Sequence, residues 1–353
     1  MKRDVDRRVQ QVWYGDSALR WLLSPFSWIY AVVIACRRAL YAAGLARSFR
    51  VAVPVVIVGN ITAGGTGKTP LTIWLAGQLA AGGHKPCIIS RGYGGTSGSG
   101  PQQATADSDP ALVGDEAVLM AIRSGCPVIV HPDRVAAANL AVELGAGVIL
   151  SDDGLQHYRL RRDYEIAVVD GTRRYGNRQL LPAGPLREPV SRLRSVDQVL
   201  VQQAAGGEVE LSFRASDKPP MNFRLVAAEI RSLDNSEARS IRDFAGSRVH
   251  ALAGIGNPER FFRLLEAHNI DVIRHPLPDH AEIEPQDLEF DDELDVIMTE
   301  KDAVKCRWLD TSNCWYTPVD VAIDEAEARG FVDRIVQTIS LHNGDAMDEG
   351  AYD

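Results

Sequence analysis

Several classes of protein are excluded by what this 353-residue chain has little of. Its five cysteines form no C-x-x-C pair, so we expect neither a disulfide framework nor a structural zinc site, and a reducing compartment suits the chain. Its longest uninterrupted apolar run, Trp28 to Cys36, has nine residues, whereas a membrane-spanning helix needs about 20. With 45% apolar and 24% charged residues, the chain is long enough for two globular lobes.

An excess of positive charge is confined to the first 50 residues. The chain carries a net charge of −9, yet residues 1–50 hold nine Lys and Arg against three acids. An acidic body does not suit a nucleic-acid partner. A basic, apolar N-terminal arm suits the anionic surface of a membrane.

This basic arm contains a predicted amphipathic helix. Ser24 and Pro25 have the residue types of an N-cap and a first helical residue, so the helix is expected from Pro25 to Ala43, with Gly44 as its stop. Three tryptophans share one face if the helix is continuous through the arm: Trp13, Trp21 and Trp28. We expect this helix to lie in the headgroup region of a membrane, and packing against its own domain is the alternative.

The most informative segment is the phosphate-binding loop that follows the arm. A β-branched run from Val51 to Val58 predicts a buried strand, a glycine-rich turn closes at Gly67-Lys68-Thr69, and a helix is predicted from Pro70 to Ala81. Strand, glycine loop, Lys-Thr and helix are typical of a P-loop. Backbone amides and the helix N-terminus would bind phosphates, Lys68 would reach the β- and γ-phosphates, and the Thr69 hydroxyl suits Mg²⁺.

The expected nucleotide-binding residues form one continuous stretch apart from position 61. They are Asn60, Thr62, Ala63, Gly64, Gly65, Thr66, Gly67, Lys68 and Thr69. Thr62 stands where the strict P-loop pattern has glycine, and Gly64 and Gly65 would supply the turn instead. We therefore predict that the protein binds a nucleoside triphosphate.

Strands alternate with helices beyond the P-loop, which predicts an α/β fold with a doubly wound parallel sheet. The expected strands are 87–90, 128–130, 148–150, 166–169 and 196–201, and the expected helices are 115–124 and 134–144. A Gly- and Ser-rich stretch, 91–109, is expected to be a mobile loop. The proline-punctuated segment 171–195 is expected to be functional, because so long a loop usually is in such a fold.

A second, smaller α/β lobe is predicted toward the C-terminus. Its expected strands are 250–254, 272–273 and 295–298, and its expected helices are 258–268, 301–306 and 325–341. We divide the chain into an N-terminal membrane-associating helix (1–50), a P-loop kinase domain (51–220), the smaller lobe (221–342) and a disordered acidic tail (343–353).

Carboxylates that follow strands are the candidates for chemistry, because ligands of parallel sheets bind beyond the carboxyl ends of the strands. Asp152 and Asp153 end an apolar strand, which predicts a Mg²⁺ site of the Walker B kind, with a helix cap and turn as the alternative. Asp115 and Glu116 open a helix, where capping is the alternative. A kinase needs one carboxylate to accept the proton of an alcohol, and Asp115 is our candidate.

Three further side chains are candidates for the site. Arg91 and Arg134 each follow a strand at the expected ligand edge, where a guanidinium can bind phosphate with two parallel hydrogen bonds. His280 lies in a proline-punctuated loop of the second lobe and could orient a catalytic carboxylate.

Taken together, these segments resemble one family, the tetraacyldisaccharide 4′-kinases, which phosphorylate the lipid A precursor of Gram-negative bacteria. The matching stretches are VGNITAGGTGKTP, SRGYGG, VGDEAVLM, DDGLQH, LPAGPLREP, GIGNPERFF, LPDH and MTEKDAVKC. The resemblance extends from about Val53 to Cys306, and DDGLQH with LPAGPLREP is more specific than the P-loop. The basic, apolar N-terminus also resembles the membrane-associating helix of that family.

The resemblance implies transfer of the γ-phosphoryl group of ATP to the 4′-hydroxyl of a tetraacylated glucosamine disaccharide 1-phosphate. It implies a peripheral enzyme on the cytoplasmic face of the inner membrane, with no required protein partner. Asp115 would be the general base, supported by His280, and Lys68 and Thr69 would hold the phosphates and Mg²⁺. Members of the family often carry a second histidine where this chain has Ala281.

The resemblance also assigns the remaining polar residues of the site. Glu116 and Asp152, with the neighbouring Asp153, would organise the metal. Arg91 and Arg134 would contact the phosphate or the sugar of the acceptor.

Two other functions remain as alternatives. A membrane-recruited GTP switch would normally read guanine with N/T-K-x-D, whereas this chain has Thr299-Glu300-Lys301-Asp302, in which lysine directly precedes aspartate. A purely structural membrane-binding module would leave Lys68 and the Asp152–Asp153 pair without a role.

Overall fold

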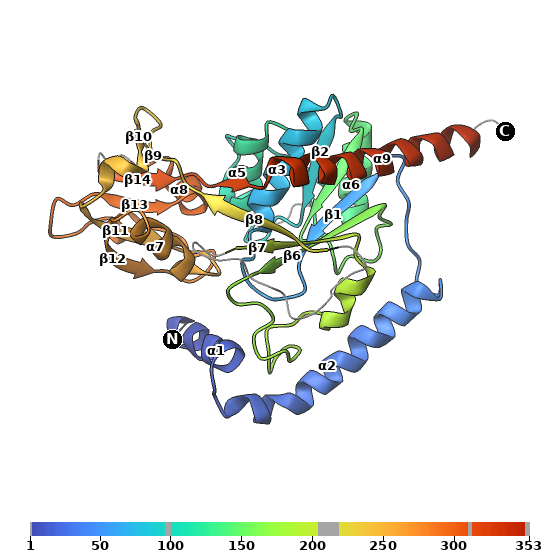
Figure 1. Cartoon of the computed structure of the whole chain (residues 1–353), viewed down its shortest axis with the longest axis horizontal. Helices are drawn as coiled ribbons and strands as arrows, with labels where there is room; N and C mark the ends of the chain where they lie inside the picture. The colour runs from blue at the N-terminus through green and yellow to red at the C-terminus, as the bar shows by residue number, and fades with distance from the viewer. Residues whose placement is uncertain (1, 96–99, 204–218, 310–312, 350–353) are drawn as a thin grey trace.

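The computed structural model describes residues 2–95, 100–203, 219–309 and 313–349. Two sheets form two lobes, with the small lobe at the left and the large lobe at the right of Figure 1. Two N-terminal helices lie at the bottom of that view, α1 (Lys2–Tyr14) below the junction of the lobes and α2 (Leu19–Ala42) below the large lobe.

The large lobe is built on a nine-stranded sheet with the order β15-β8-β7-β6-β1-β5-β2-β4-β3. Its strands are β1 (Val55–Gly59), β2 (Pro86–Ser90), β3 (Gln102–Ala104), β4 (Val128–Val130), β5 (Val148–Asp152), β6 (Tyr164–Asp170), β7 (Gln198–Gln202), β8 (Met221–Val226) and β15 (Asp320–Ala322). The two edge strands β3 and β15 pair antiparallel, and the other strands pair parallel. In the centre, Val56 pairs with Leu150 on one side and with Tyr164 on the other.

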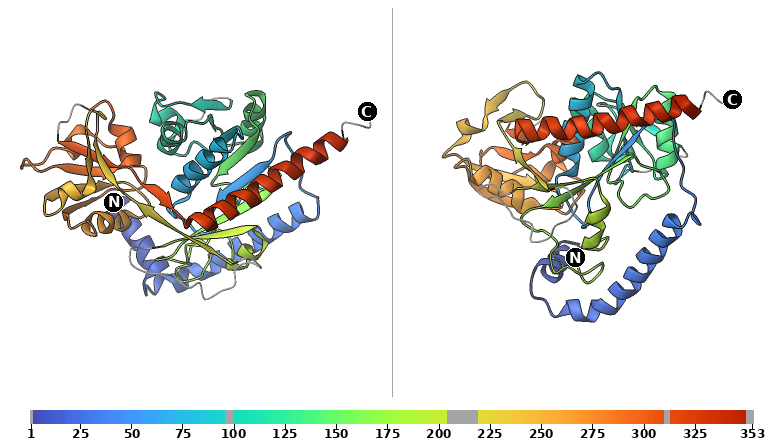
Figure 2. Two further views of the ribbon diagram at one scale, coloured as in Figure 1. Left: turned by 45° about the horizontal axis from the view of Figure 1, so that its top comes forward. Right: turned by 45° about the vertical axis from the view of Figure 1, so that its right-hand side comes forward.

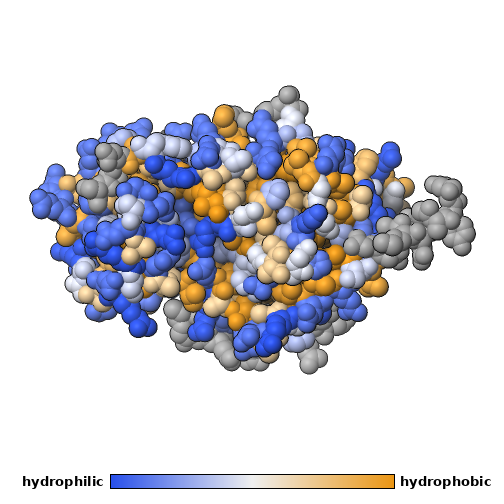
Figure 3. All heavy atoms as spheres, turned by 90° about the horizontal axis from the view of Figure 1, so that it is seen from above, coloured by the Kyte–Doolittle hydropathy of each residue, from blue (hydrophilic) through white to orange (hydrophobic). Residues whose placement is uncertain are grey.

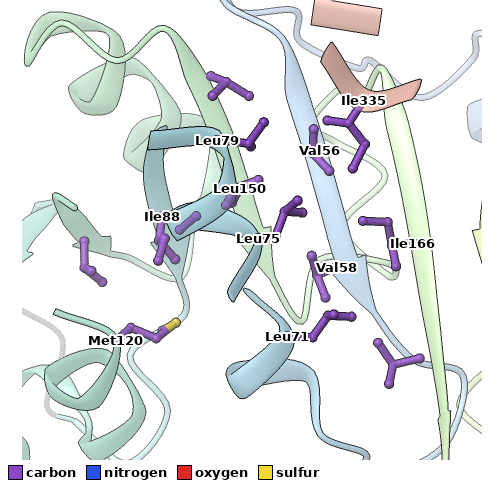
Figure 4. Close-up of a cluster of buried hydrophobic side chains, with 14 of the residues drawn as sticks. Val56, Val58, Leu71, Leu75, Leu79, Ile88, Met120, Leu150, Ile166 and Ile335 are labelled. Carbon is purple, nitrogen blue, oxygen red and sulfur yellow. The ribbon is translucent and has the colours of Figure 1, made fainter. Parts of the chain in front are cut away.

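Helices cover both faces of this sheet, as the alternating sequence pattern predicts. They are α3 (Lys68–Ala81), α4 (Pro110–Val113), α5 (Asp115–Ser124), α6 (Arg134–Glu143) and α9 (Glu325–Glu349), with a 3-10 turn at Val190–Ser195. Val56 and Val58 point into the core beneath α3, α5 and α9, whereas Val55 and Ile57 point into the core on the α6 face. Figure 4 shows Leu71, Leu75 and Leu79 of α3 packed on the first of these cores.

The small lobe is a six-stranded sheet with the order β10-β9-β14-β13-β11-β12. Its elements are β9 (Glu229–Ser232), β10 (Ala238–Ser240), β11 (Arg248–Ala253), α7 (Pro258–Glu266), β12 (Asp271–Pro276), β13 (Val296–Thr299), α8 (Glu300–Cys306) and β14 (Cys314–Thr317), with 3-10 turns at Ile241–Phe244 and Pro285–Asp287. Its core gathers Phe261, Phe262 and Ile297. In Figure 3 the surface of this lobe is mostly hydrophilic, and apolar residues are more frequent toward the large lobe.

The C-terminal part of the chain is divided between the lobes differently from the expected boundary at residue 220. Strands β8 and β15 belong to the large sheet, and α9 buries Phe331, Ile335 and Ile339 in the large-lobe core. The reason is long-range packing, since the apolar face of α9 fits the surface beside α3. Helix α9 itself extends to Glu349, past the expected start of the tail at residue 343. Extending an existing helix costs less than starting one.

The N-terminal arm differs from its prediction in two ways. A break at residues 15–18 separates α1 from α2, so the three tryptophans do not share one continuous helix, and Trp13 instead donates to the carbonyl of Pro182 (3.0 Å). Pro25 lies inside α2 rather than at its start. The proline is exposed, and the Ser24 hydroxyl donates to the Arg20 carbonyl (2.8 Å), a local contact at the point where proline removes a backbone donor.

By length and composition alone, α2 is apolar enough to cross a membrane. The uninterrupted apolar run did not predict this, because isolated polar residues divide a helix that is apolar on average. In the right-hand view of Figure 2 the helix lies at the edge of the molecule.

Candidate functional site

The P-loop lies between β1, which ends at Gly59, and α3, which begins at Lys68. Gly67 caps α3 with a φ of 89°, a left-handed conformation that favours glycine. The loop is held from outside by Gln156, whose amide donates to the Asn60 carbonyl (3.0 Å), and by the Pro185 carbonyl, which accepts from the Ala63 amide (2.7 Å).

Two polar atoms of this loop are buried without a hydrogen-bond partner among the described residues. They are the Asn60 side-chain oxygen and the Thr66 hydroxyl. Buried polar groups are normally satisfied. The loop and its backbone amides line a cleft of about 2580 Å³ between the lobes, so a phosphate-bearing ligand fits this position.

Asp152 ends β5 beside the P-loop and is buried (2% exposed). Thr72 of α3 donates to its Oδ1 (3.1 Å), and Arg134 donates to its backbone carbonyl (2.9 Å). Burial, followed by the nearby charges of Glu116 and Asp153, raises the pKa of Asp152 to about 7. This carboxylate is therefore short of positive charge, which is the condition a divalent cation would relieve.

Asp153, the next residue, has the opposite electrostatic environment. Its carboxylate accepts from Arg187 (2.8 and 3.0 Å) and lies 3.5 Å from Lys68 Nζ. Burial alone would raise the pKa of Asp153, but Lys68 and Arg187 bring it well below its usual range. Its φ of 49° is uncommon for a residue with a side chain, which is typical of positions held by their surroundings at a site.

Asp115 and His280 come from different lobes and meet across the cleft. Asp115 is the first residue of α5, and His280 follows β12 with a φ of 57°. His280 Nδ1 lies 3.0 and 3.1 Å from the two oxygens of Asp115, which is 4% exposed. Burial opposes ionisation of Asp115, but the hydrogen bond from His280 and the charge of Lys301 bring its pKa below the ordinary value.

The predicted metal ligands Thr69, Glu116, Asp152 and Asp153 all line this cleft. Glu116 and Asp153 are engaged elsewhere, since Glu116 accepts from Lys301 (3.0 Å) and Asp153 pairs with Lys68 and Arg187. Within the described ranges, no group of three or more His, Cys, Asp or Glu is arranged to hold a metal ion. Thr69 and Asp152 supply oxygen donors, the kind that Mg²⁺ prefers beside a bound phosphate.

The two predicted acceptor-binding arginines differ in position. Arg91 is exposed and lines the cleft. Arg134 also lines the cleft but is only 3% exposed, and its Nη2 is bound to the Asp152 carbonyl. The Nε and Nη1 atoms of Arg134 have no partner among the described residues. Arg134 thus supports the end of β5, a role that its position after a strand did not indicate.

Sequence reasoning missed several residues that organise this site. They are Thr72, Arg187 and Lys301. Arg187 lies in the LPAGPLREP stretch and Lys301 in MTEKDAVKC, so the motif matches were the available signal. Asp302, the acid of the rejected guanine motif, is buried and accepts from the Gly254 amide (2.8 Å) and the Thr299 hydroxyl (2.6 Å), so it is committed to the fold.

The small lobe also contacts the P-loop directly. Gly256 follows β11, and a Cβ placed there would lie 2.7 Å from the Gly65 amide nitrogen. Arg173 of the large lobe donates to the Gly256 carbonyl (2.9 Å). Elsewhere between the lobes, Arg123 of α5 pairs with Glu300 of α8 (2.6 Å). The two lobes are therefore in contact at the P-loop.

A phosphate-binding loop and a histidine bound to a buried carboxylate, both at one cleft, are typical of a P-loop phosphotransferase. Comparison with known proteins identifies the kind. The family described as LpxK, tetraacyldisaccharide-1-P 4′-kinase, matches residues 19–337, and the chain belongs to this family of lipid A biosynthesis kinases.

Named relatives and a solved structure agree with this family. The tetraacyldisaccharide 4′-kinase of Nitrosococcus oceani is 47% identical over 322 residues, which are 91% of this chain and 92% of that protein. The enzyme of the same name from Methylobacillus flagellatus is 44% identical over 343 residues, 96% of this chain and 98% of that protein. A crystal structure of LpxK from Aquifex aeolicus in complex with ATP superposes with a TM-score of 0.76 at 28% identity, covering 91% of this chain and 99% of that chain.

Proposed function

We propose that this kinase transfers the γ-phosphoryl group of ATP to the 4′-hydroxyl of a tetraacyldisaccharide 1-phosphate, with Asp115 as the general base. The observation that carries the proposal is the position of His280, which lines the same cleft as the P-loop and is hydrogen bonded to the buried carboxylate of Asp115. Family membership supports the acceptor, and the ATP complex of the Aquifex aeolicus relative supports the donor.

The P-loop would hold the triphosphate. Its amides and the Thr66 hydroxyl would bind the β- and γ-phosphates, and Lys68 would add positive charge at the γ-phosphate. Lys68 now lies 3.5 Å from Asp153, which is itself held by Arg187. We therefore assign Asp153 the role of positioning Lys68.

Magnesium fits beside this loop. Thr69 and Asp152 would hold it, and Glu116 faces the same cleft but is bound to Lys301. When bound, Mg²⁺ supplies positive charge that offsets the negative charge of the phosphates and of Asp152.

Asp115 would take the proton of the acceptor hydroxyl as its oxygen attacks the γ-phosphorus. Its lowered pKa keeps the carboxylate ionised and able to accept at neutral pH. His280 orients the carboxylate through one hydrogen bond. Closure of the two lobes around the cleft would exclude water, a competing acceptor for the phosphoryl group.

The amphipathic helix α2 would bring the active site to the membrane that holds the acceptor. One face of α2 packs on the protein, where the buried Ser27 hydroxyl donates to the Leu180 carbonyl (2.8 Å) and Tyr30 bonds the Arg187 carbonyl (3.2 Å). The other face exposes large apolar side chains, namely Trp21, Leu22, Phe26, Trp28, Ile29, Val32 and Val33. A helix with one face on protein and one apolar face open suits a peripheral position on the cytoplasmic face of the inner membrane.

Product labelling tests the proposed function. Purified full-length protein is incubated with Mg²⁺, ATP labelled in its γ-phosphate, and a tetraacyldisaccharide 1-phosphate, and the glycolipid is separated and counted. Label at the 4′ position that is absent with Lys68→Ala supports the proposal. An unlabelled glycolipid in the presence of a folded, ATP-binding protein contradicts it.

A further inference from the structure

Both ring nitrogens of His280 have a charged partner. On one side, Nδ1 faces the Asp115 carboxylate at 3.0 Å. On the other, Nε2 lies 3.1 Å from the Lys301 ammonium. Lys301 also binds Glu116 of α5 (3.0 Å) and Asp279 (3.2 Å), so its position is fixed by three acceptors.

The chemistry of these partners determines where the proton on the ring must lie. A lysine ammonium is a donor only, so Nε2 must accept from Lys301 with its lone pair. An ionised carboxylate is an acceptor only, so Nδ1 must carry the hydrogen that is donated to Asp115. The other neutral tautomer would place an N–H against the ammonium and a lone pair against the carboxylate, and it would lose both hydrogen bonds.

We propose that Lys301 is a positioning residue that holds His280 in the Nδ1–H tautomer, so that Asp115 is both oriented and the sole acceptor of the substrate proton. The catalytic part of this inference rests on the proposed function. As the alcohol oxygen forms its bond to the γ-phosphorus, its proton passes to Asp115, and the bond from phosphorus to the β-γ bridging oxygen breaks to release ADP. His280 already has a hydrogen on Nδ1 and a cation at Nε2, so it does not take the proton onward.

The groups that face His280 from each neighbouring element support this assignment. They are Asp115 of α5, Asp279 of its own loop, Lys301 of α8 and the Tyr93 ring, whose centroid lies 4.7 Å away. Asp279 is 3.7 Å from Nε2, beyond hydrogen-bond distance, and it binds Lys301 instead. Lys301 and His280 both belong to the small lobe, so the tautomer can be set before the lobe meets Asp115.

Nitrogen NMR on the full-length protein tests the tautomer without any substrate. Histidine is labelled with ¹⁵N in the ring, and the His280 signals are assigned by their loss in His280→Gln. Above the pH at which the ring loses its positive charge, we expect the ¹⁵N chemical shift of Nδ1 to be that of a nitrogen with a hydrogen. We expect the shift of Nε2 to be that of a nitrogen without one. A protonated Nε2 in the wild-type protein overturns the proposal, whatever the fate of the glycolipid.

Two substitutions on α8 then test whether Lys301 is the cause. In Lys301→Met we expect the chemical shift of an unprotonated Nε2 to be lost, or to be averaged with that of the other tautomer. We also expect kcat to fall about 10-fold or more, with little change in the KM for ATP. Lys305→Gln is the matched control, because Lys305 pairs with Asp302 (2.8 Å) and the Ala281 carbonyl (2.8 Å) and lies outside hydrogen-bond reach of His280 in the structure. An unchanged tautomer in a folded Lys301→Met protein overturns the proposal.

A failed proposed function would look different. The wild-type His280 would then have the expected tautomer, and Lys301→Met would still change it, while the glycolipid stayed unlabelled by the wild-type protein. If the wild-type protein labelled the glycolipid normally but His280 had the opposite tautomer, only the proposed role of Lys301 would be contradicted.

Discussion

Two adjacent carboxylates, Asp152 and Asp153, have pKa values moved in opposite directions by their surroundings. Asp152 is buried near two other acids, whereas Asp153 faces Lys68 and Arg187. Such divergence within one site is a common way to give like groups different roles. It favours Asp152 as the residue beside the metal and Asp153 as the residue that holds the lysine.

Because the pKa values of Asp152 and Asp153 are shifted in opposite directions, replacing each acid by its amide should change the stability of the protein in opposite directions. The folded-state pKa of Asp152 is about 7, above the ordinary ~4, so its contribution to stability is present at low pH and is lost as pH rises toward 7. In nucleotide-free protein at about pH 8, Asp152→Asn should therefore raise the free energy of unfolding by roughly 1–3 kcal/mol. Urea unfolding at several pH values measures this gain, which should fade toward about pH 4.

Asp153→Asn is the control, because its expected effect on the free energy of unfolding has the opposite sign. The depressed pKa of Asp153 means that its stabilisation is present above the ordinary ~4 and is lost as pH falls below it. This variant should be less stable than the wild type at neutral pH. Equal signs for the two variants would contradict the assigned environments.

Asp115→Asn tests the general base. The amide cannot accept the proton of the alcohol, so kcat should fall by about 10²–10⁴-fold. The affinity for ATP should stay nearly the same, because the side chain binds His280. Steady-state kinetics with labelled ATP and a fluorescent-nucleotide titration measure the two quantities. A normal kcat with weakened nucleotide binding would make Asp115 a structural cap instead.

At the residue scale, the sequence predicted those site residues whose positions depend on their neighbours in the chain. Lys68 and Thr69 begin the helix after β1, Asp152 ends β5, and all three line one cleft with His280. Arg187 and Lys301 could not be predicted in the same way. Their partners, Asp153 and Glu116, lie far away in the chain, and only the fold brings each pair together.

At the element scale, α2 is the helix whose surface does not match a protein interior. Trp21 and Trp28 are 66% and 73% exposed. Replacing both by aspartate should abolish binding to anionic vesicles, because buried apolar area and aromatic anchors hold such helices at the interface. Vesicle flotation measures binding, and ATP affinity should be unchanged because both side chains are exposed and neither lines the cleft that contains the P-loop.

Trp308→Asp is the matched control for these substitutions. Trp308 is also exposed (64%), but it follows α8 in the small lobe, away from α2. This variant should float with vesicles as the wild type does. If the Trp21 and Trp28 variant still floats, the membrane is bound by another surface.

Helix α9 shows what an element-level pattern can and cannot predict. Its periodicity gave a helix from residue 325, and the structure begins α9 at Glu325. Periodicity does not tell which partner covers the apolar face, and that partner is the large-lobe core through Phe331 and Ile335. A pattern along the chain fixes the face of a helix, whereas the complementary surface comes from strands much earlier in the sequence.

At the scale of the whole molecule, the two lobes meet at the P-loop in a contact that only glycine permits. Gly256 of the small lobe approaches the P-loop so closely that a Cβ would lie 2.7 Å from the Gly65 nitrogen and 3.4 Å from the Gly64 Cα. Gly256 does not have the positive φ that favours glycine, so alanine there would disturb the contact between the lobes rather than its own backbone. The GIGNPERFF motif thus has a reason for glycine at this position.

Gly256→Ala should therefore separate the lobes by a small distance. His280 and Lys301 would withdraw from Asp115, and we expect kcat to fall by about 10-fold, since a loss of this order follows when a catalytic group is misplaced by a fraction of an ångström. The radius of gyration from small-angle X-ray scattering with bound nucleotide should increase. Gly77→Ala is the control, because a Cβ at Gly77 in α3 meets no atom within 4 Å. If Gly256→Ala keeps both the wild-type radius and the wild-type kcat, the contact between the lobes is incidental to catalysis, and Asp115 must be oriented by other means.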